Sequence, residues 1–289
     1  MKNLVRRSGR FLFGRVLPRL AYPVVSGPLR SSRFILGSMA GDGGGASVYF
    51  NKMEPEQTES MLRELNEGDV FFDIGANVGY YSILGSKLVG KDGSVVACEP
   101  VIRNLAFLQQ HVTLNKADNV RILAFACSSE NGTARFATGP NTAMGHLISG
   151  GKVENDDVLV PTATLDKISE ELGLVPDVIK IDVEGAELGV LKGAQSVLAE
   201  AKPTIFLSTH SNELRSDCLK FLEDMGYKII EGNDPHEFVA RQPERTLKIK
   251  GGGEVYPMTG EIFPGECSGV RMVKGSIFVV VPRPDVIFA

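Results

Sequence analysis

Short apolar strands alternate with amphipathic helices from residue 54 to residue 225, and no other feature of the sequence constrains the fold as strongly. Strands are expected at Val70 to Ile74, Val95 to Glu99, Val120 to Phe125, Val178 to Asp182 and Thr204 to Ser208. Helices are expected from Pro55 to before Gly68, after Pro100, at Leu188 to Leu198 and at Leu214 to Met225. This alternation predicts an α/β domain with a mostly parallel sheet flanked by helices.

The last part of the chain has a different pattern. Two apolar runs, Val270 to Met272 and Ile277 to Val281, flank Lys274 and Gly275, which predicts an antiparallel hairpin. The second of these runs is the longest aliphatic stretch, and it is far shorter than the ~20 residues that a membrane-spanning helix needs.

Composition excludes several classes of protein. The chain has 289 residues, 31 basic and 35 acidic side chains, and 43% apolar residues, so neither a disordered chain nor a nucleic-acid binder is expected. Its four cysteines lie far apart without a C-x-x-C pair, which argues against a disulfide framework or a zinc site. These features favour a cytoplasmic protein with reduced thiols.

Residues 1–47 form a basic N-terminal extension before a domain predicted at residues 48–289, since no acidic residue precedes Asp42. The arginine-rich composition would suit an organellar transit segment. Phe13, Val16, Leu17 and Leu20 have helical spacing, which would suit a basic helix on an anionic membrane surface. Because Pro18 breaks that helix, we favour an extension that packs on the domain or on a partner, with Gly41 to Gly45 as a flexible joint.

The stretch VFFDIGANVGYYS places a glycine-rich turn after the first predicted strand. Ligands bind open α/β sheets at this edge. Gly75 and Gly79 would let the backbone bend close to a ligand, and Asp73 would offer an anionic acceptor. The alternative is an ordinary turn in which Asp73 only caps the next helix.

The spacing of the turn indicates which ligand it suits. Asn77 and Tyr80 stand where a dinucleotide-binding turn has glycines, and no G-K-[ST] sequence follows. A carboxylate at Asp73 would repel a pyrophosphate and attract an ammonium or sulfonium group. Glu99, at the end of the second strand, is placed to accept hydrogen bonds from ribose hydroxyls. The pattern therefore predicts a ligand with a ribose and a positively charged tail.

A second charged motif, IKIDVEGAE, lies where a buried strand meets a helix. Alternation puts Lys180 and Asp182 on one side of that strand, where apolar residues are usual, and this pairing indicates a site. The alternative is a buried ion pair that also caps the helix. Asp182 is the first candidate for the catalytic centre.

The motifs FFDIGANVGYYS, ACEP, TLDKI and IKIDVEGAELGVLKGA resemble those of the FkbM family of class I S-adenosylmethionine-dependent methyltransferases, from Val70 to about Met225. The resemblance implies a Rossmann-like seven-stranded sheet whose final strand is antiparallel, which would fit the C-terminal hairpin. It also implies S-adenosylmethionine as cofactor and methyl transfer to a hydroxyl oxygen of a sugar, glycan or other small natural product.

By the same resemblance, the methionine part of the cofactor would lie among Asp73, Gly75, Asn77 and Gly79, and the ribose at Glu99. Residues Ala126 to Ser128 would lie by the adenine. Of these, Ser128 offers a polar group, whereas Cys127 is better interpreted as a small buried thiol.

A hydroxyl needs a base or a metal to become a nucleophile. Asp182 or His210 could be that base, with Lys180 and Glu184 beside them. Many members of the family have a glutamate two residues before this histidine, where this chain has Ser208. A metal held by Asp182, Glu184 and a further acid is conceivable, but no ligand spacing requires it and none is expected.

Two longer segments are candidates for shaping an acceptor pocket: the loop Thr138 to Asp157, which contains His146, and Gly232 to Gly265, which could act as a lid. A solvated connection is the alternative for the first. At the level of function, the alternatives are a methyltransferase-like domain that binds without turnover and, on weaker grounds, a nicotinamide-dependent oxidoreductase.

Overall fold

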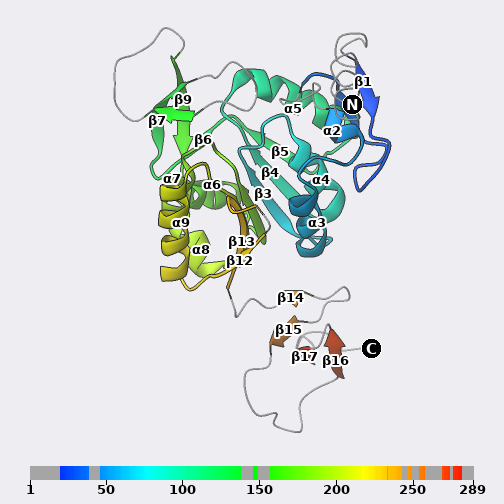
Figure 1. Cartoon of the computed structure of the whole chain (residues 1–289), viewed down its shortest axis with the longest axis vertical. Coiled ribbons are helices and arrows are strands. Elements are labelled where there is room, and N and C mark those ends of the chain that lie inside the picture. The colour runs from blue at the N-terminus through cyan, green and yellow to red at the C-terminus, as the bar shows by residue number, and fades with distance from the viewer. Residues whose placement is uncertain are drawn as a thin grey trace, which may run out of the picture.

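The computed structural model describes residues 20–38, 46–137, 146–148, 157–232, 234–242, 247–248, 254–257, 269–273 and 276–281. A seven-stranded sheet with helices on both faces dominates it (Figure 1). The strand order is β12-β13-β11-β10-β3-β4-β5. This confirms the predicted Rossmann-like, mostly parallel sheet.

Five strands of this sheet are the predicted ones, and all of them run parallel. They are β3 (Val70–Ile74), β4 (Ser94–Cys98), β5 (Val120–Leu123), β10 (Val178–Ile181) and β11 (Thr204–Ser208). The remaining two are β12 (Lys228–Glu231) and β13 (Glu237–Arg241), and β13 is antiparallel to both of its neighbours. The antiparallel strand of the sheet is therefore β13.

The C-terminal hairpin exists but belongs to another sheet. Strands β16 (Gly269–Val273) and β17 (Ser276–Val281) pair antiparallel, as predicted, beside β15 (Glu254–Pro257) and β14 (Leu247–Lys248). The prediction that this hairpin supplies the antiparallel strand of the main sheet is wrong. The actual strand, β13, lies in the segment interpreted as a lid, where charged and glycine residues obscure its five-residue alternation of buried and half-buried side chains.

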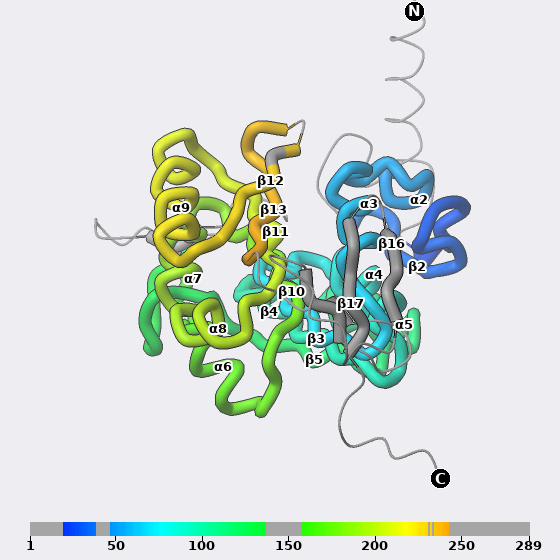
Figure 2. Tube along the Cα trace, turned by 90° about the horizontal axis from the view of Figure 1, so that it is seen from below, coloured from blue at the N-terminus to red at the C-terminus, as the bar shows by residue number. Residues whose placement is uncertain are grey.

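Helices cover the two faces of the sheet in separate groups (Figure 2). One face packs against α3 (Pro55–Glu64), α4 (Tyr80–Val89) and α5 (Ile102–Asn115), and the other against α6 (Leu165–Leu172), α7 (Glu187–Lys192), α8 (Gln195–Glu200) and α9 (Asn212–Asp224). Successive strand residues alternate between the two cores, with Phe71 in the first and Phe72 in the second. The helix predicted at 188–198 is split at Gly193, where a Cβ atom would lie 2.1 Å from the carbonyl oxygen of Ser128.

Residues 20–38 pack on the domain, and the side chains of Phe34 and Leu36 join the first core. They form the hairpin of β1 (Ala21–Pro23) and β2 (Arg33–Ile35), followed after a gap by α2 (Ala46–Tyr49). His111, on α5, accepts a hydrogen bond at Nε2 from the Ile35 backbone (3.0 Å), so its Nδ1–H donates to the Val78 carbonyl (2.6 Å). Burial lowers the pKa of His111, which fits this neutral tautomer.

Several predictions concern residues outside the described ranges. The possible amphipathic helix lies there except for Leu20, as do Gly41 to Gly45 and most of Thr138 to Asp157. The domain boundary after residue 47 stays a prediction. Among the described residues, no helix has the length and apolar character needed to cross a membrane.

A smaller sheet beside the main one was not predicted. It consists of β6 (Ala126–Cys127), β9 (Asp157–Ala163), β7 (Gly132–Ala137) and β8 (His146–Ile148), in that order. Strand β6 continues the chain directly after β5 and carries it out of the main sheet.

Candidate active site

A cavity of about 580 Å³ lies where the parallel strands of the main sheet end. Strand β13 is antiparallel, so its first residue, Glu237, reaches the same edge and also lines the cavity. This volume is typical of a small-molecule site. Nine of the eleven predicted site residues line it: Asp73, Gly75, Asn77, Glu99, Cys127, Lys180, Asp182, Glu184 and His210.

Asp73 supplies a buried carboxylate at the end of β3. Its side chain is 1% exposed, Oδ2 accepts a hydrogen bond from Ser82 Oγ (2.6 Å), and Oδ1 is buried without a hydrogen-bond partner. Burial raises the pKa of Asp73, although Lys180 and Ser82 oppose the shift. An unpartnered buried oxygen beside a cavity suits a donor from a ligand, and a cationic donor most of all.

The turn after Asp73 is compressed against the neighbouring strand. Gly75 has φ +81°, and a Cβ atom there would lie 1.8 Å from the carbonyl oxygen of Asp182. Asn77 also has positive φ (51°), which is strained for a residue other than glycine. Gly79, with φ +92°, is the N-cap of α4 and does not line the cavity, so it shapes the turn from outside.

Glu99 follows β4 on the opposite side of this turn and is 4% exposed. Its carboxylate accepts hydrogen bonds from the backbone of Asn77 (2.8 Å) and Val101 (2.8 Å), and from Asn104 Nδ2 (3.2 Å). Burial nevertheless raises the pKa of Glu99 to about 7. Oε1 takes the bonds from Val101 and Asn104, whereas Oε2 takes the one from Asn77 and retains capacity to accept from a ribose hydroxyl. Asn104 was missed because a polar residue on a helix gives no signal of its own.

The far end of the cavity is lined by Cys127 and two aromatic residues, Phe125 and Phe136. Phe136 comes from β7, in the small sheet that the sequence did not predict. Ser128 does not line the cavity: its backbone N–H donates to the Ala163 carbonyl (3.1 Å). This end is therefore apolar and suited to an aromatic base.

Lys180 and Asp182 form a buried ion pair on β10 and just beyond it. Lys180 is 2% exposed, and its Nζ lies 3.1 Å from Asp182 Oδ2 and 4.8 Å from the centre of the Tyr81 ring. Burial alone would lower the pKa of Lys180, but the carboxylates of Asp182, Asp73 and Glu54 outweigh it and the pKa is raised. Lys180 is therefore charged.

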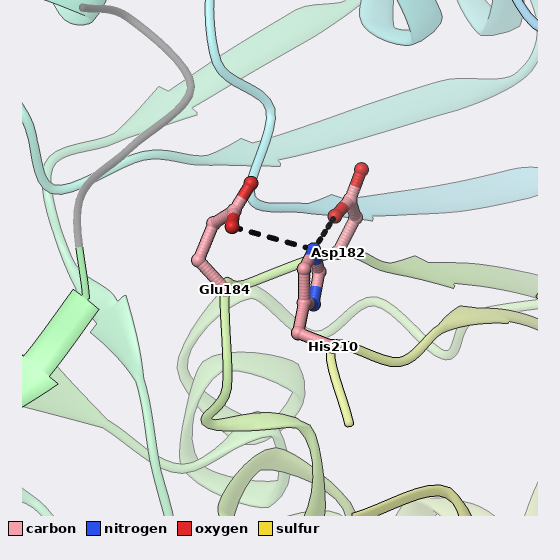
Figure 3. A group of neighbouring side chains, drawn as sticks. All are labelled: Asp182, Glu184 and His210. Carbon is pink, nitrogen blue, oxygen red and sulfur yellow. Dashed lines mark ion pairs between the residues drawn. The ribbon is translucent and has the colours of Figure 1, made fainter. Parts of the chain in front are cut away.

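His210 lies among three carboxylates, and Figure 3 shows two of them, Asp182 and Glu184. Its Nδ1 lies 2.7 Å from Glu187 Oε1, and its Nε2 lies 3.6 Å from Asp182 and 3.4 Å from Glu184. The hydrogen bond to Glu187, opposed by burial and supported by the charges of Glu184, Glu187 and Asp182, raises the pKa of His210 to about 8. At neutral pH the imidazole is thus mostly cationic.

The ligand atoms of Asp182, Glu184 and His210 lie within 4.8 Å of one another and could hold a divalent cation. A protonated His210 balances the same two carboxylates without a metal. The expectation that no metal is needed stays a prediction.

Comparisons with known proteins identify the family and relatives of this chain. The family model described as "Methyltransferase FkbM domain" matches residues 73–229. The chain is 29% identical to the hexuronic acid methyltransferase AglP of Haloferax volcanii over 192 residues. This aligned region covers 64% of this chain and 75% of that protein. A putative methyltransferase of Jannaschia sp. is 24% identical over 184 residues, covering 58% and 65% of the two chains.

Among solved structures, the FkbM methyltransferase of Methylobacillus flagellatus covers 83% of this chain and 60% of its own, with 17% identity and a TM-score of 0.46. The family match spans more than half of the chain. Residues of the two motifs, around Asp73 and Asp182, line the cavity. S-adenosylmethionine is the cofactor. The chain belongs to the FkbM family of methyltransferases.

Proposed function

We propose that this methyltransferase methylates a hydroxyl oxygen of a sugar or glycan. The observation that carries the proposal is that one cavity joins two unlike halves: the turn of Asp73 and Glu99, and the charged group of Lys180, Asp182 and His210. The first half suits the cofactor, and the second offers donors and acceptors for a polyhydroxyl acceptor. The name of the relative from Haloferax volcanii, a hexuronic acid methyltransferase, supports a sugar as acceptor.

S-adenosylmethionine supplies an electrophilic methyl group on a sulfonium. The free oxygen of Asp73 would accept from its ammonium group, Glu99 would accept from the ribose, and Phe125 and Phe136 would contact the adenine. Cys127 would pack there as a small apolar side chain.

On the acceptor side, alignment of the hydroxyl with the methyl group supplies much of the rate. Lys180 fixes Asp182 through their ion pair, which would leave Asp182 Oδ1 to accept from the acceptor. Cationic His210, held by Glu187 and Glu184, would donate to an acceptor oxygen. Histidine would thus orient the acceptor rather than remove its proton.

Calorimetric titration with S-adenosylmethionine and its demethylated product tests the cofactor half. Asp73→Asn removes one acceptor from a buried carboxylate and is expected to weaken binding about tenfold or more, since a charge-assisted hydrogen bond contributes roughly 1.5–3 kcal/mol. Asp92→Asn, at an exposed carboxylate that does not line the cavity, is the matched control and should bind as the wild type does. Equal binding by all three proteins would contradict the assignment of Asp73.

Transfer of labelled methyl groups tests the reaction. The wild type is incubated with a panel of p-nitrophenyl glycosides that includes a glucoside and a glucuronide, and then with fractionated extract. We expect label in an alkali-stable ether, and its loss in Asp182→Asn. A domain that binds without turnover would bind the cofactor and label nothing, and label in an amine or carboxyl ester would refute hydroxyl methylation.

A further inference from the structure

One row of residues crosses three neighbouring strands at the cavity edge. Ser208 on β11 pairs directly with Glu237 on β13, and Asp182 continues the β10 register that pairs Lys180 with Phe206. Side chains paired across strands point to the same face of a sheet. Asp182, Ser208 and Glu237 therefore lie side by side, with a small residue between two acids.

The face they share is the one covered by α3 and α4. Phe206 and Val239, one row deeper, belong to the core beneath those helices, and Gln57 Nε2 of α3 lies 3.4 Å from Ser208 Oγ. Ser208 has a short side chain, and it lines the cavity together with the acids on both sides of it. The cavity therefore reaches Ser208 between two carboxylates.

Glu237 has no assigned task in the binding of the cofactor. Its half-buried carboxylate makes no hydrogen bond or ion pair with any residue that the structure describes. The charged groups that act on it are Glu54 before α3, Asp234 of its own segment, Lys180 of β10 and Asp182 just after β10. His236 is its neighbour in the chain. Burial, then Glu54 and Asp234, raise the pKa of Glu237 to about 7 against the opposing effect of Lys180.

Asp182 and His210, the candidate bases predicted from the sequence, already have partners. Asp182 is paired with Lys180 at 3.1 Å and lies 3.6 Å from the Nε2 atom of His210. His210 already carries a proton and donates to Glu187. Building on the proposed function, we propose that Glu237 is the general base that takes the proton from the acceptor hydroxyl over Ser208.

The step balances without a further reagent. As the acceptor oxygen forms its bond to the methyl carbon, the bond from that carbon to sulfur breaks and sulfur keeps the electron pair. The hydroxyl proton passes to the Glu237 carboxylate and then to solvent through the open side of the cavity. Asp182 and His210 hold the acceptor while this occurs.

The first test compares the wild type with Glu237→Gln on whichever glycoside or extract fraction the wild type methylates. General bases contribute about 10²–10⁴-fold, so kcat should fall by that factor while affinity for S-adenosylmethionine stays within about twofold. The wild-type rate should fall as the pH drops below about 7, and Glu237→Gln should lack this acidic limb. Asp224→Asn, at an exposed acid on α9, is the control and should retain both rate and profile.

The second test moves the carboxylate across the strand pair. Paired Cβ atoms on antiparallel strands are about 4.5–5.5 Å apart, so a glutamate at position 208 can reach the same space. We expect the double variant Ser208→Glu/Glu237→Ser to transfer methyl groups at least about ten times faster than Glu237→Ser alone. A purely structural role for Glu237 would give no such rescue.

The outcomes separate the two proposals. If the wild type transfers methyl groups and Glu237→Gln keeps both the rate and the acidic limb, Glu237 is not the base and the proposed function stands. If the folded wild type binds the cofactor and labels no acceptor, the proposed function fails, and the base assignment fails with it.

Discussion

Substitution of Gly75 tests whether the cofactor turn and the Asp182 backbone are held by direct contact. Gly75 has φ +81°, and an added Cβ atom would meet the Asp182 carbonyl oxygen at 1.8 Å. Left-handed backbone costs a residue with a Cβ atom about 1–2 kcal/mol, and overpacking a tight contact costs about 1–3 kcal/mol more. Gly75→Ala should therefore lower the free energy of unfolding by about 2–5 kcal/mol.

Gly68 provides the matched control, because it precedes the same strand with φ +89° and nothing would lie within 4 Å of its Cβ atom. Gly68→Ala should cost only the backbone term, about 1–2 kcal/mol. Urea unfolding measures both variants, and calorimetry measures their affinity for S-adenosylmethionine, which should weaken only in Gly75→Ala. Equal losses of stability together with equal affinities would refute the proposed contact.

Three further predictions concern single carboxylates and a histidine. Asp166 accepts from the backbone of Ser196 and Val197 at the start of α8, so Asp166→Ala should destabilise the fold by about 1–2 kcal/mol in urea unfolding, and an unchanged midpoint would contradict this. Hydrogen bonds from ribose hydroxyls favour the ionised form of Glu99, whose pKa is about 7. Calorimetry should therefore show that the wild type binds S-adenosylmethionine more tightly at pH 8 than at pH 6, and that Glu99→Gln lacks this pH dependence. The pKa of His210 is raised in the folded protein, so its protonation stabilises the fold fully below about pH 6.5, and this stability is lost as the pH rises through about 8. Urea unfolding should show the wild type more stable than His210→Gln by at most about 1 kcal/mol at pH 6, because the side chain is a third exposed. The two proteins should be equally stable at pH 9.

The parallel strands and the cofactor turn could be predicted because their signals are local. Val70–Ile74 and Thr204–Ser208 have the predicted bounds, since each is a short apolar run between turn residues. Asp73 lies at the end of β3 and Glu99 directly follows β4, so the parallel order alone brings them to one edge of the sheet.

What could not be predicted depends on contacts between distant segments. Glu237 reaches the cavity only because β13 is inserted antiparallel beside β11, and its sequence gives no hint of that partner. Phe136 likewise arrives through pairing of β7 with β9. The family resemblance places Ser128 by the adenine, yet its backbone packs against Gly193 at the break between α7 and α8.

His111 gives the N-terminal hairpin an influence on the cofactor turn. A single imidazole receives a hydrogen bond from Ile35 and donates one to Val78, so each bond favours the geometry that the other requires. Coupling of this kind is reciprocal. A cofactor that stabilises the turn should also protect the hairpin of β1 and β2 from proteolysis. A partner that binds this hairpin would change the affinity for the cofactor without entering the cavity.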